Sequence, residues 1–166
     1  MKRFFSKKWL ALLIAPAFLL SFSVFSNLSF SGDWALNESK SDLGQFPNFV
    51  PRKIKVDQKD DGITITKTSQ GFNGEDVIQT ETLTFDGKEI ESTIFGSSKR
   101  KASEKWSDDG QTLTITFSLA LDFNGQITEV TGKEVWTQSD AGKTFTLQSN
   151  SSSSFGDNAY KAVYGK

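Results

Sequence analysis

The stretch TLTITFSLALDF, residues 112–123, is the longest regular pattern in the chain. Apolar side chains fall on every second position and threonine or serine takes most positions between them, which is the period of a β-strand with one apolar face. The turn-forming dipeptides Asp109-Gly110 and Asn124-Gly125 bracket the stretch, so the strand is predicted to pair on both sides with its neighbours in the chain. Its apolar face consists of Leu113, Ile115, Phe117, Leu119, Leu121 and Phe123.

The same alternation recurs along most of the chain. Turn signals separate the segments at spacings of roughly 8–12 residues, and no stretch after the N-terminal segment has the helical period. The sequence predicts an all-β fold, an antiparallel meander of about ten strands closing into a barrel or a closely related sandwich. The predicted strands are 30–36, 53–58, 63–68, 77–85, 89–95, 102–106, 112–123, 126–138, 143–148 and 159–164.

Residues 43–51 break the strand pattern most clearly. They hold Pro47 and Pro51 together with Phe46 and Phe49, and their irregular order predicts the longest loop of the chain. A long loop that directly follows the first strand is the natural lid of a barrel.

Two smaller irregularities lie further along. The serine-rich run 150–154 is predicted to be a loop. Gly132 lies inside the predicted strand 126–138, where it indicates a bulge or bend, and curvature at that point suits a closing barrel.

The N-terminal segment has the composition of a secretory signal peptide. Four basic residues precede an uncharged apolar run at 9–20, and the small residues Ser21 and Ser23 follow it. The run is shorter than the roughly 20 residues that span a bilayer, so an uncleaved anchor is the less favoured alternative. We predict a signal peptide at 1–23, with residue 26 as the latest cleavage position, and one barrel domain at 27–166. The mature chain is expected to be periplasmic or extracellular, without stable membrane insertion.

Composition excludes several classes of function. Cysteine and histidine are absent, which removes disulfides, thiol catalysis, Ser-His-Asp machinery, His-ligated zinc and axial His ligation of haem. Removal of residues 1–23 takes four of the 19 basic residues and none of the 20 acidic ones, leaving a net charge of −5 that argues against nucleic acid as a partner. We therefore expect no enzymatic activity, no catalytic residues, no metal site and no cofactor, while the oligomeric state stays open.

Charged side chains single out no site. Residues 99–101, Lys-Arg-Lys, lie beside a predicted turn, where a solubilising edge is favoured over a contact with an anion or membrane headgroups. Residues 57–62 lack the ligand pattern of a calcium loop and are interpreted as a hairpin turn. Four acidic residues of predicted strands are expected to face outward, and nothing marks a pair of them for acid–base work. They are Glu81, Glu91, Glu129 and Glu134.

The first predicted strand contains Gly32-Asp33-Trp34, which resembles the Gly-x-Trp signature of lipocalins and the wider calycin group. In that group the Trp closes one end of the barrel beneath a basic residue near the C-terminus, a place that Lys166 or Lys161 would take here. The resemblance implies a lipocalin-like barrel with Gly32, Trp34 and Lys166 as its barrel-closing motif. A buried Trp in another β fold is the alternative.

Residues 32–41 are more narrowly similar to the start of a group of uncharacterised secreted bacterial proteins. These read Gly-x-Trp-x-Leu-Asn-x-x-Lys-Ser, and their later Asp-Gly turn and terminal Tyr-x-Lys are matched here at 86–87 and 164–166.

Two functional hypotheses follow. The first is an exported lipocalin-like barrel that binds a small, largely apolar ligand, since a closed barrel of roughly eight to ten strands can leave room for one ligand. The alternative is a structural or interaction barrel of the cell envelope, filled by its own aromatic side chains and without a ligand. On the first hypothesis, the candidate ligand-binding residues are Phe46, Phe49, Phe117, Leu119 and Leu121.

Overall fold

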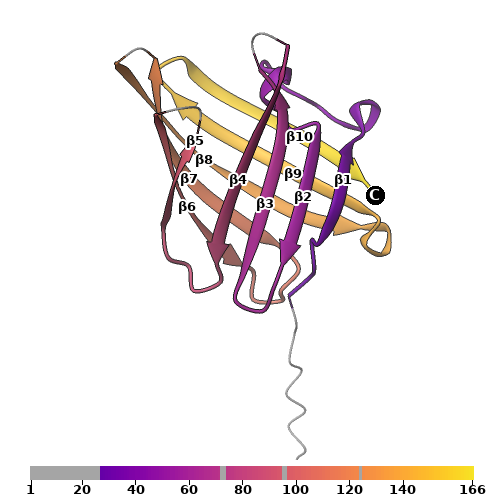
Figure 1. The fold of residues 1–166 in the computed structure, drawn as a ribbon. Helices are drawn as coiled ribbons and strands as arrows, with labels where there is room; N and C mark the ends of the chain where they lie inside the picture. The colour runs from indigo at the N-terminus through magenta and orange to yellow at the C-terminus, as the bar shows by residue number, and fades with distance from the viewer. Residues whose placement is uncertain (1–26, 72–73, 95–96, 124) are drawn as a thin grey trace, which may run out of the picture.

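A computed structural model describes residues 27–71, 74–94, 97–123 and 125–166; the predicted signal peptide at 1–23 lies outside these residues. The described chain forms one antiparallel sheet of ten strands in the order β4-β3-β2-β1-β10-β9-β8-β7-β6-β5 (Figure 1). The predicted all-β meander is confirmed. The strands are β1 (Gly32–Leu36), β2 (Lys53–Gln58), β3 (Gly62–Gln70), β4 (Asp76–Thr84), β5 (Ile90–Ile94), β6 (Ser98–Trp106), β7 (Leu113–Phe123), β8 (Gln126–Ser139), β9 (Thr144–Ser153) and β10 (Gly156–Gly165), with short 3-10 helices η1 (Glu38–Lys40), η2 (Pro47–Phe49) and η3 (Asp140–Gly142).

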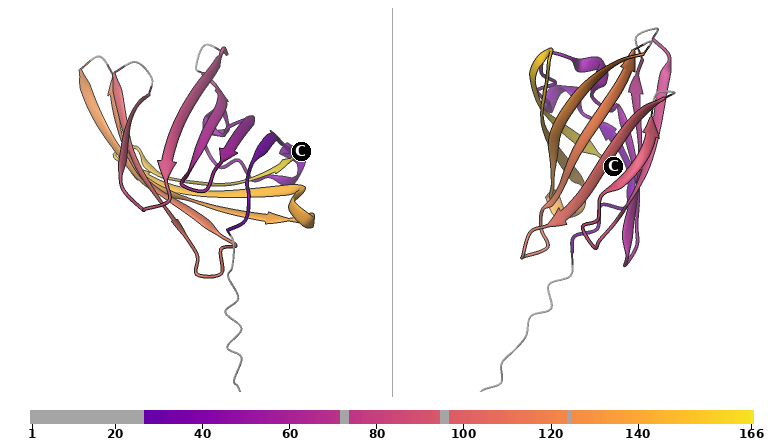
Figure 2. Two further views of the ribbon diagram at one scale, coloured as in Figure 1. Left: turned by 60° about the horizontal axis from the view of Figure 1, so that its bottom comes forward. Right: turned by 90° about the vertical axis from the view of Figure 1, so that its left-hand side faces the viewer.

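The sheet curls into a nearly closed barrel (Figure 2). β1 pairs with both β2 and β10, which joins the first and last parts of the chain. The two ends of the sheet are β4 and β5, and the seam of the barrel lies between them. No helix in the described part of the chain is long and apolar enough to cross a membrane.

β7 occupies the position that its alternation predicts. It pairs with β6 from Lys99↔Ala120 to Trp106↔Leu113 and with β8 from Leu113↔Trp136 to Phe123↔Gln126, so the predicted pairing on both sides is confirmed. Leu113 and Ile115 are fully buried on its inward face.

The predicted loop at 150–154 and the predicted bulge at Gly132 are wrong. Residues 150–153 belong to β9 and pair with both β8 and β10. Hydrogen bonds to these two strands satisfy their backbone N–H and C=O groups, so the segment is a strand although its serine-rich composition is typical of a loop. Gly132 is not a bulge, since the registers of β8 with β7 and with β9 are unbroken around it. A Cβ at Gly132 would lie 2.5 Å from the Asn150 carbonyl oxygen and 2.8 Å from Phe117 Cζ, so glycine permits close approach there.

The interior has two parts, which we call the closed half and the open half. The closed half lies toward the β2–β3, β4–β5, β6–β7 and β8–β9 turns, and the open half toward the β3–β4 and β9–β10 turns and η2 (Figure 1). Five large side chains at 0–2% exposure fill the closed half, and we call them the aromatic core. They are Phe30, Trp34, Trp136, Phe145 and Tyr164.

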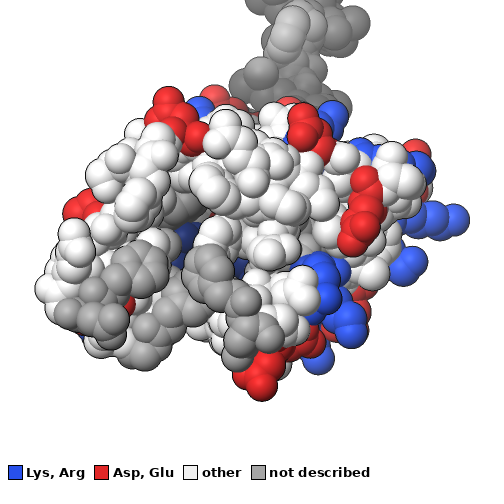
Figure 3. All heavy atoms as spheres, turned by 90° about the horizontal axis from the view of Figure 1, so that it is seen from above, with Lys and Arg blue, Asp and Glu red and all other residues white. Residues whose placement is uncertain are grey.

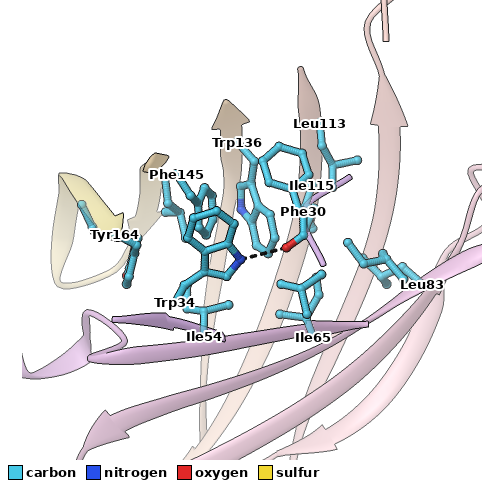
Figure 4. Close-up of a cluster of buried hydrophobic side chains, with 14 of the residues drawn as sticks. Phe30, Trp34, Ile54, Ile65, Leu83, Leu113, Ile115, Trp136, Phe145 and Tyr164 are labelled. Carbon is cyan, nitrogen blue, oxygen red and sulfur yellow. Dashed lines mark hydrogen bonds between the residues drawn. The ribbon is translucent and has the colours of Figure 1, made fainter. Parts of the chain in front are cut away.

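The aromatic core is held by ring packing and by buried hydrogen bonds, one of which is drawn in Figure 4. The Trp34 indole N–H donates to the Phe30 carbonyl at 2.8 Å, which satisfies the ring's only polar group. The Phe145 ring centroid lies 4.7 Å from that of Trp136 and 5.2 Å from that of Tyr164. The predicted orientation of Trp34 into the core is confirmed.

Candidate functional site

Four charged side chains from four strands meet inside the barrel, beside the aromatic core. Lys67 Nζ donates to both carboxylate oxygens of Glu134, at 2.6 and 2.8 Å. Arg100 Nε donates to Glu81 at 2.9 Å. The side chains are 6–11% exposed, so these are buried ion pairs. We call Lys67 (β3), Glu81 (β4), Arg100 (β6) and Glu134 (β8) the ion cluster.

Strand alternation brings these residues inward. On β3, Lys67 follows Ile63 and Ile65 at steps of two, so it shares their inward face. On β8, Glu134 stands two residues before the fully buried Trp136, and the Trp136 indole N–H donates to its carboxylate at 3.0 Å. The ion cluster is thus the next inward layer beyond the aromatic core.

Three sequence predictions about charge are therefore wrong. Glu81 and Glu134 face inward rather than outward, and Arg100 is a buried residue of a strand paired on both sides rather than part of a solubilising edge. Alternation shows which residues of a strand share a face but not whether that face points inward or outward. We assigned these charged residues to the outer face because charged side chains usually contact water, and that assignment is wrong. The outward prediction holds for Glu91 and Glu129, which are exposed.

The surroundings of Arg100 and Glu134 favour the charged forms of these two side chains. Burial alone would lower the pKa of Arg100, but Glu81 and Glu134 outweigh it and the pKa is raised. Burial likewise opposes the charged form of Glu134, yet Lys67 and Arg100 hold the pKa of that carboxyl below its usual value. Tyr160 lies close by, and burial followed by the charge of Glu134 raises its pKa, so its hydroxyl keeps its proton.

A cavity of about 100 Å³ adjoins the ion cluster. The cavity is large enough to hold water, because one water molecule needs only about 10–15 Å³ of such volume. From the open end the surface is hollowed and basic side chains are visible within the hollow (Figure 3). The cavity is lined by Phe49, Pro51, Ile65, Lys67, Ser69, Gln79, Thr80, Glu81, Ile94, Arg100, Glu134 and Tyr160.

The predicted lid segment, 43–51, lies at the open end (Figure 1). Part of it is helical, because Pro47 starts the single turn of η2. Phe49 lines the cavity, and its ring centroid lies 6.2 Å from that of Phe46. The two rings are 48% and 44% exposed, so neither is locked into the core.

The remaining candidate ligand-binding residues lie on the inward face of β7. The Phe117 ring centroid is 4.3 Å from Arg100 Cζ, which places this ring against the ion cluster. Leu119 is the register partner of Arg100, and Leu121 follows on the same face. All three are half-buried, whereas Leu113 and Ile115, which lie on the same strand in the closed half, are fully buried. The apolar face of β7 therefore runs from the packed core into the open half.

The structure also brings Gly32, Trp34 and Lys166 together, but in the closed half. Lys166 Nζ lies 4.7 Å from the centroid of the Trp34 ring, so Lys166 rather than Lys161 makes this contact. Gly32 has φ +138°, and a Cβ there would lie 3.0 Å from Lys166 Cε. The positive φ favours glycine, and the missing side chain leaves room for the lysine stem.

Glu104 is a buried charge outside the ion cluster. Its residue is 4% exposed, and its Oε2 has no hydrogen-bond partner among the described atoms. Burial and then the charge of Asp86 raise its pKa, against a hydrogen bond from the Gly87 N–H. This carboxyl faces the closed half, where β6 places it opposite Ile115.

A larger groove of about 710 Å³ lies on the outer face of β6 to β10. Hydroxyl and amide side chains line most of it, with the exposed Glu89, Lys133 and Asp157. It contains none of the buried charges, so the ion cluster and its cavity are the better candidate site. No group of three or more acidic side chains in the described ranges is placed to hold a metal ion.

Comparison with solved structures finds the same fold in a ligand-binding protein. The crystal structure of zebrafish ileal bile acid-binding protein complexed with cholic acid matches with a TM-score of 0.51 and 19% sequence identity. The match covers 82% of this chain and 98% of that chain. At this identity the likeness shows the fold alone, an antiparallel lipocalin-like barrel. No protein-family model and no curated protein matches.

Sequence reasoning missed the ion cluster, although part of its signal was present. In Ile63-Thr64-Ile65-Thr66-Lys67 the lysine extends an apolar face, and in Glu134-Val135-Trp136 the acid does the same. What the sequence did not supply was the pairing of Lys67 with a residue 67 positions away.

Proposed function

We propose that the open half binds a small, largely apolar ligand whose polar end reaches the ion cluster. The apolar part would lie along Phe117, Leu119 and Leu121 and beneath Phe46 and Phe49. The observation that carries this proposal is a buried cluster of two ion pairs that lines a cavity at the open end of the barrel. Binding, rather than catalysis, is the role that such a site supports.

The ion cluster has little value as a device for stability alone. Taking charges out of water costs several kcal/mol per ion, and replacing a buried ion pair with packed apolar residues is often neutral or stabilising. The closed half of the same barrel is filled in that apolar way. A polar layer beside a cavity is typical of a ligand-binding site, because a few polar groups in an otherwise apolar pocket fix the orientation of the ligand.

The fold supports the proposal independently. A barrel of the same architecture is known in complex with cholic acid, so this architecture can take a small molecule. The cavity of about 100 Å³ is smaller than the roughly 300–1,000 Å³ of typical ligand sites. We infer that it receives only the polar end, and that the 43–51 segment moves aside for the rest.

Titration of the protein with fatty acids, retinoids and isoprenoid lipids tests the proposal, with binding followed by calorimetry. Micromolar binding by the wild type that weakens about tenfold in Phe49→Ser supports it, because Phe49 lines the cavity. Phe155→Ser is the matched control: Phe155 is 73% exposed and does not line the cavity, so its removal should leave affinity unchanged.

The competing role is a structural or interaction barrel of the cell envelope with no ligand. The filled closed half is the observation that favours it. No binding of any compound, together with a loss of stability in Phe49→Ser, would support this role and end the binding proposal.

We further propose that the chain is exported and cleaved near residue 23 or 26. The proposal is supported by the order of residue types in 1–23, where basic residues come first, an apolar run follows and small residues come last. Intact-mass measurement of protein from the exported fraction should give a chain starting near Val24 or Asn27. A mature species that retains Trp9 would refute cleavage.

A further inference from the structure

We infer that the ion cluster selects ligands whose polar end carries no net charge. This inference rests on the proposed function and adds the chemical class of the ligand's head group. A compact amide or amine oxide fits it, whereas a free carboxylate or ammonium does not.

The argument begins with the arrangement of charge. Besides its 2.6 Å contact with Glu134, Lys67 Nζ lies 3.9 Å from a Glu81 oxygen. Besides its 2.9 Å contact with Glu81, Arg100 lies 3.7 Å from a Glu134 oxygen. The four groups therefore form a ring of alternating sign with no net charge.

Such a ring gives no net attraction to an ion. A carboxylate that approaches Lys67 or Arg100 also approaches the carboxylate paired with that cation, and an ammonium meets the reverse arrangement. The ion would lose its hydration in a buried site without gaining an unpaired counter-charge. A head group without net charge avoids this cost. An amide can donate to the carboxylates and accept from Lys67 or Arg100, and an amine oxide can accept from either cation.

The rest of the cavity lining matches this chemistry. Ser69, Gln79 and Tyr160 supply hydroxyl and amide groups beside the ion cluster. The Tyr160 hydroxyl can both donate and accept a hydrogen bond. A volume of about 100 Å³ accommodates a head group of a few heavy atoms and excludes a bulky one.

A series of octyl compounds with four head groups tests the inference. Octanamide and N,N-dimethyloctylamine N-oxide have no net charge, whereas octanoate carries one negative charge and octylammonium one positive charge. Calorimetry on the wild-type protein should show the two neutral compounds binding about tenfold tighter than either ion. Octanoate or octylammonium binding as tightly as octanamide would overturn the inference.

Charge-altering variants supply a second readout that does not depend on absolute affinity. Glu81→Gln gives the ring a net positive charge, so the preference for octanoate over octylammonium should rise about tenfold. Lys67→Gln gives it a net negative charge and should shift the preference equally the other way. The exposed pair of Glu91 and Lys99 provides the controls. Glu91→Gln and Lys99→Gln make the same charge changes outside the barrel and should leave the preference unaltered.

The outcomes separate this inference from the proposed function. Selective binding of octanoate by the wild type would refute the inference and leave the binding function standing. A preference that moves equally in the cluster variants and in the surface controls would also refute it, because the effect would then be one of overall charge. No binding of any octyl compound or of the larger lipids would refute both.

Discussion

The closed and open halves of the barrel are built from the same strands by the same alternation, yet their interiors are opposite in character. In the closed half the aromatic core is 0–2% exposed and its indole N–H groups are satisfied within the protein. In the open half, inward positions carry charges, a cavity and half-buried apolar side chains. On three strands the change occurs within one step of two residues: Ile65 to Lys67 on β3, Ala102 to Arg100 on β6, and Trp136 to Glu134 on β8.

On the proposed function, this difference means that one meander places stability and ligand binding at different positions along the same strands. Large apolar side chains in the closed half hold the barrel together, which leaves the open half free to carry groups that contribute little to stability. The ion cluster also spans the seam, because Glu81 is on β4 and Arg100 is on β6. Side chains thus connect the two parts of the sheet where the backbone ladder is interrupted.

The largest expected effect comes from emptying the closed half. Trp34→Ala removes a fully buried ring and its hydrogen bond, and should lower the free energy of unfolding by about 3–5 kcal/mol. Leu121→Ala removes a half-buried side chain from the open half and should cost less than about 1.5 kcal/mol. Denaturant unfolding measures both. Equal losses would abolish the distinction between the halves.

The next effect concerns the ion cluster and depends on pH. Glu134→Gln leaves Lys67 and Arg100 with one fewer buried counter-charge, and should cost about 3 kcal/mol at neutral pH. The pKa of Glu134 is lowered in the folded protein, so its contribution is complete above its unfolded value of about 4.5 and is lost as pH falls through the folded pKa.

Unfolding experiments from neutral to acid pH check this sign. Wild-type stability should fall below about pH 4.5, and the Glu134→Gln profile should be flatter there because the variant lacks the titrating group. Parallel profiles for the two proteins would contradict this account of the ion cluster.

Glu104 is the exception within the closed half, and its replacement should be stabilising. Because its pKa is raised in the folded protein, its contribution is complete below about 4.5 and is lost as pH rises through the folded value. Glu104→Gln removes that loss and should add about 1 kcal/mol at pH 7. The gain should shrink on acidification, and a gain that is constant with pH would show that charge is not its cause.

The smallest effect tests the contact at the edge of the aromatic core. Lys166→Met removes the ammonium from the Trp34 face and should cost about 0.5 kcal/mol, the value for an exposed cation–π contact. Lys161→Met is the control, since that lysine makes no contact with the ring, and it should have no measurable effect. Equal changes in the two variants would remove the contact from the account of stability.

Much of the fold could be predicted from the sequence because alternation and turn dipeptides are local signals. The predicted strand 53–58 coincides with β2, and the pattern at 112–123 gives β7 to within one residue. The candidate site could be predicted only in part. Phe49 follows from the irregular 43–51 segment, whereas Lys67 and Glu134 acquire their inward positions from partners on remote strands. The local pattern specifies which residues share a face. Whether a charged residue can be buried on that face depends on a counter-charge from a strand remote in the sequence.

The most direct test of the separation between the halves uses two tryptophans as built-in reporters. The Trp136 indole N–H donates to Glu134 in the ion cluster, and the Trp34 indole N–H donates to Phe30 in the closed half. The barrel domain is titrated separately with octanamide and with octanoate, and nitrogen–proton NMR spectra are recorded. The Trp136 indole signal should shift until it saturates with the compound that binds more tightly, which we expect to be octanamide. The Trp34 signal should stay in place. A Trp34 shift as large as that of Trp136, or no shift of Trp136 with either compound, would contradict the assignment of binding to the open half.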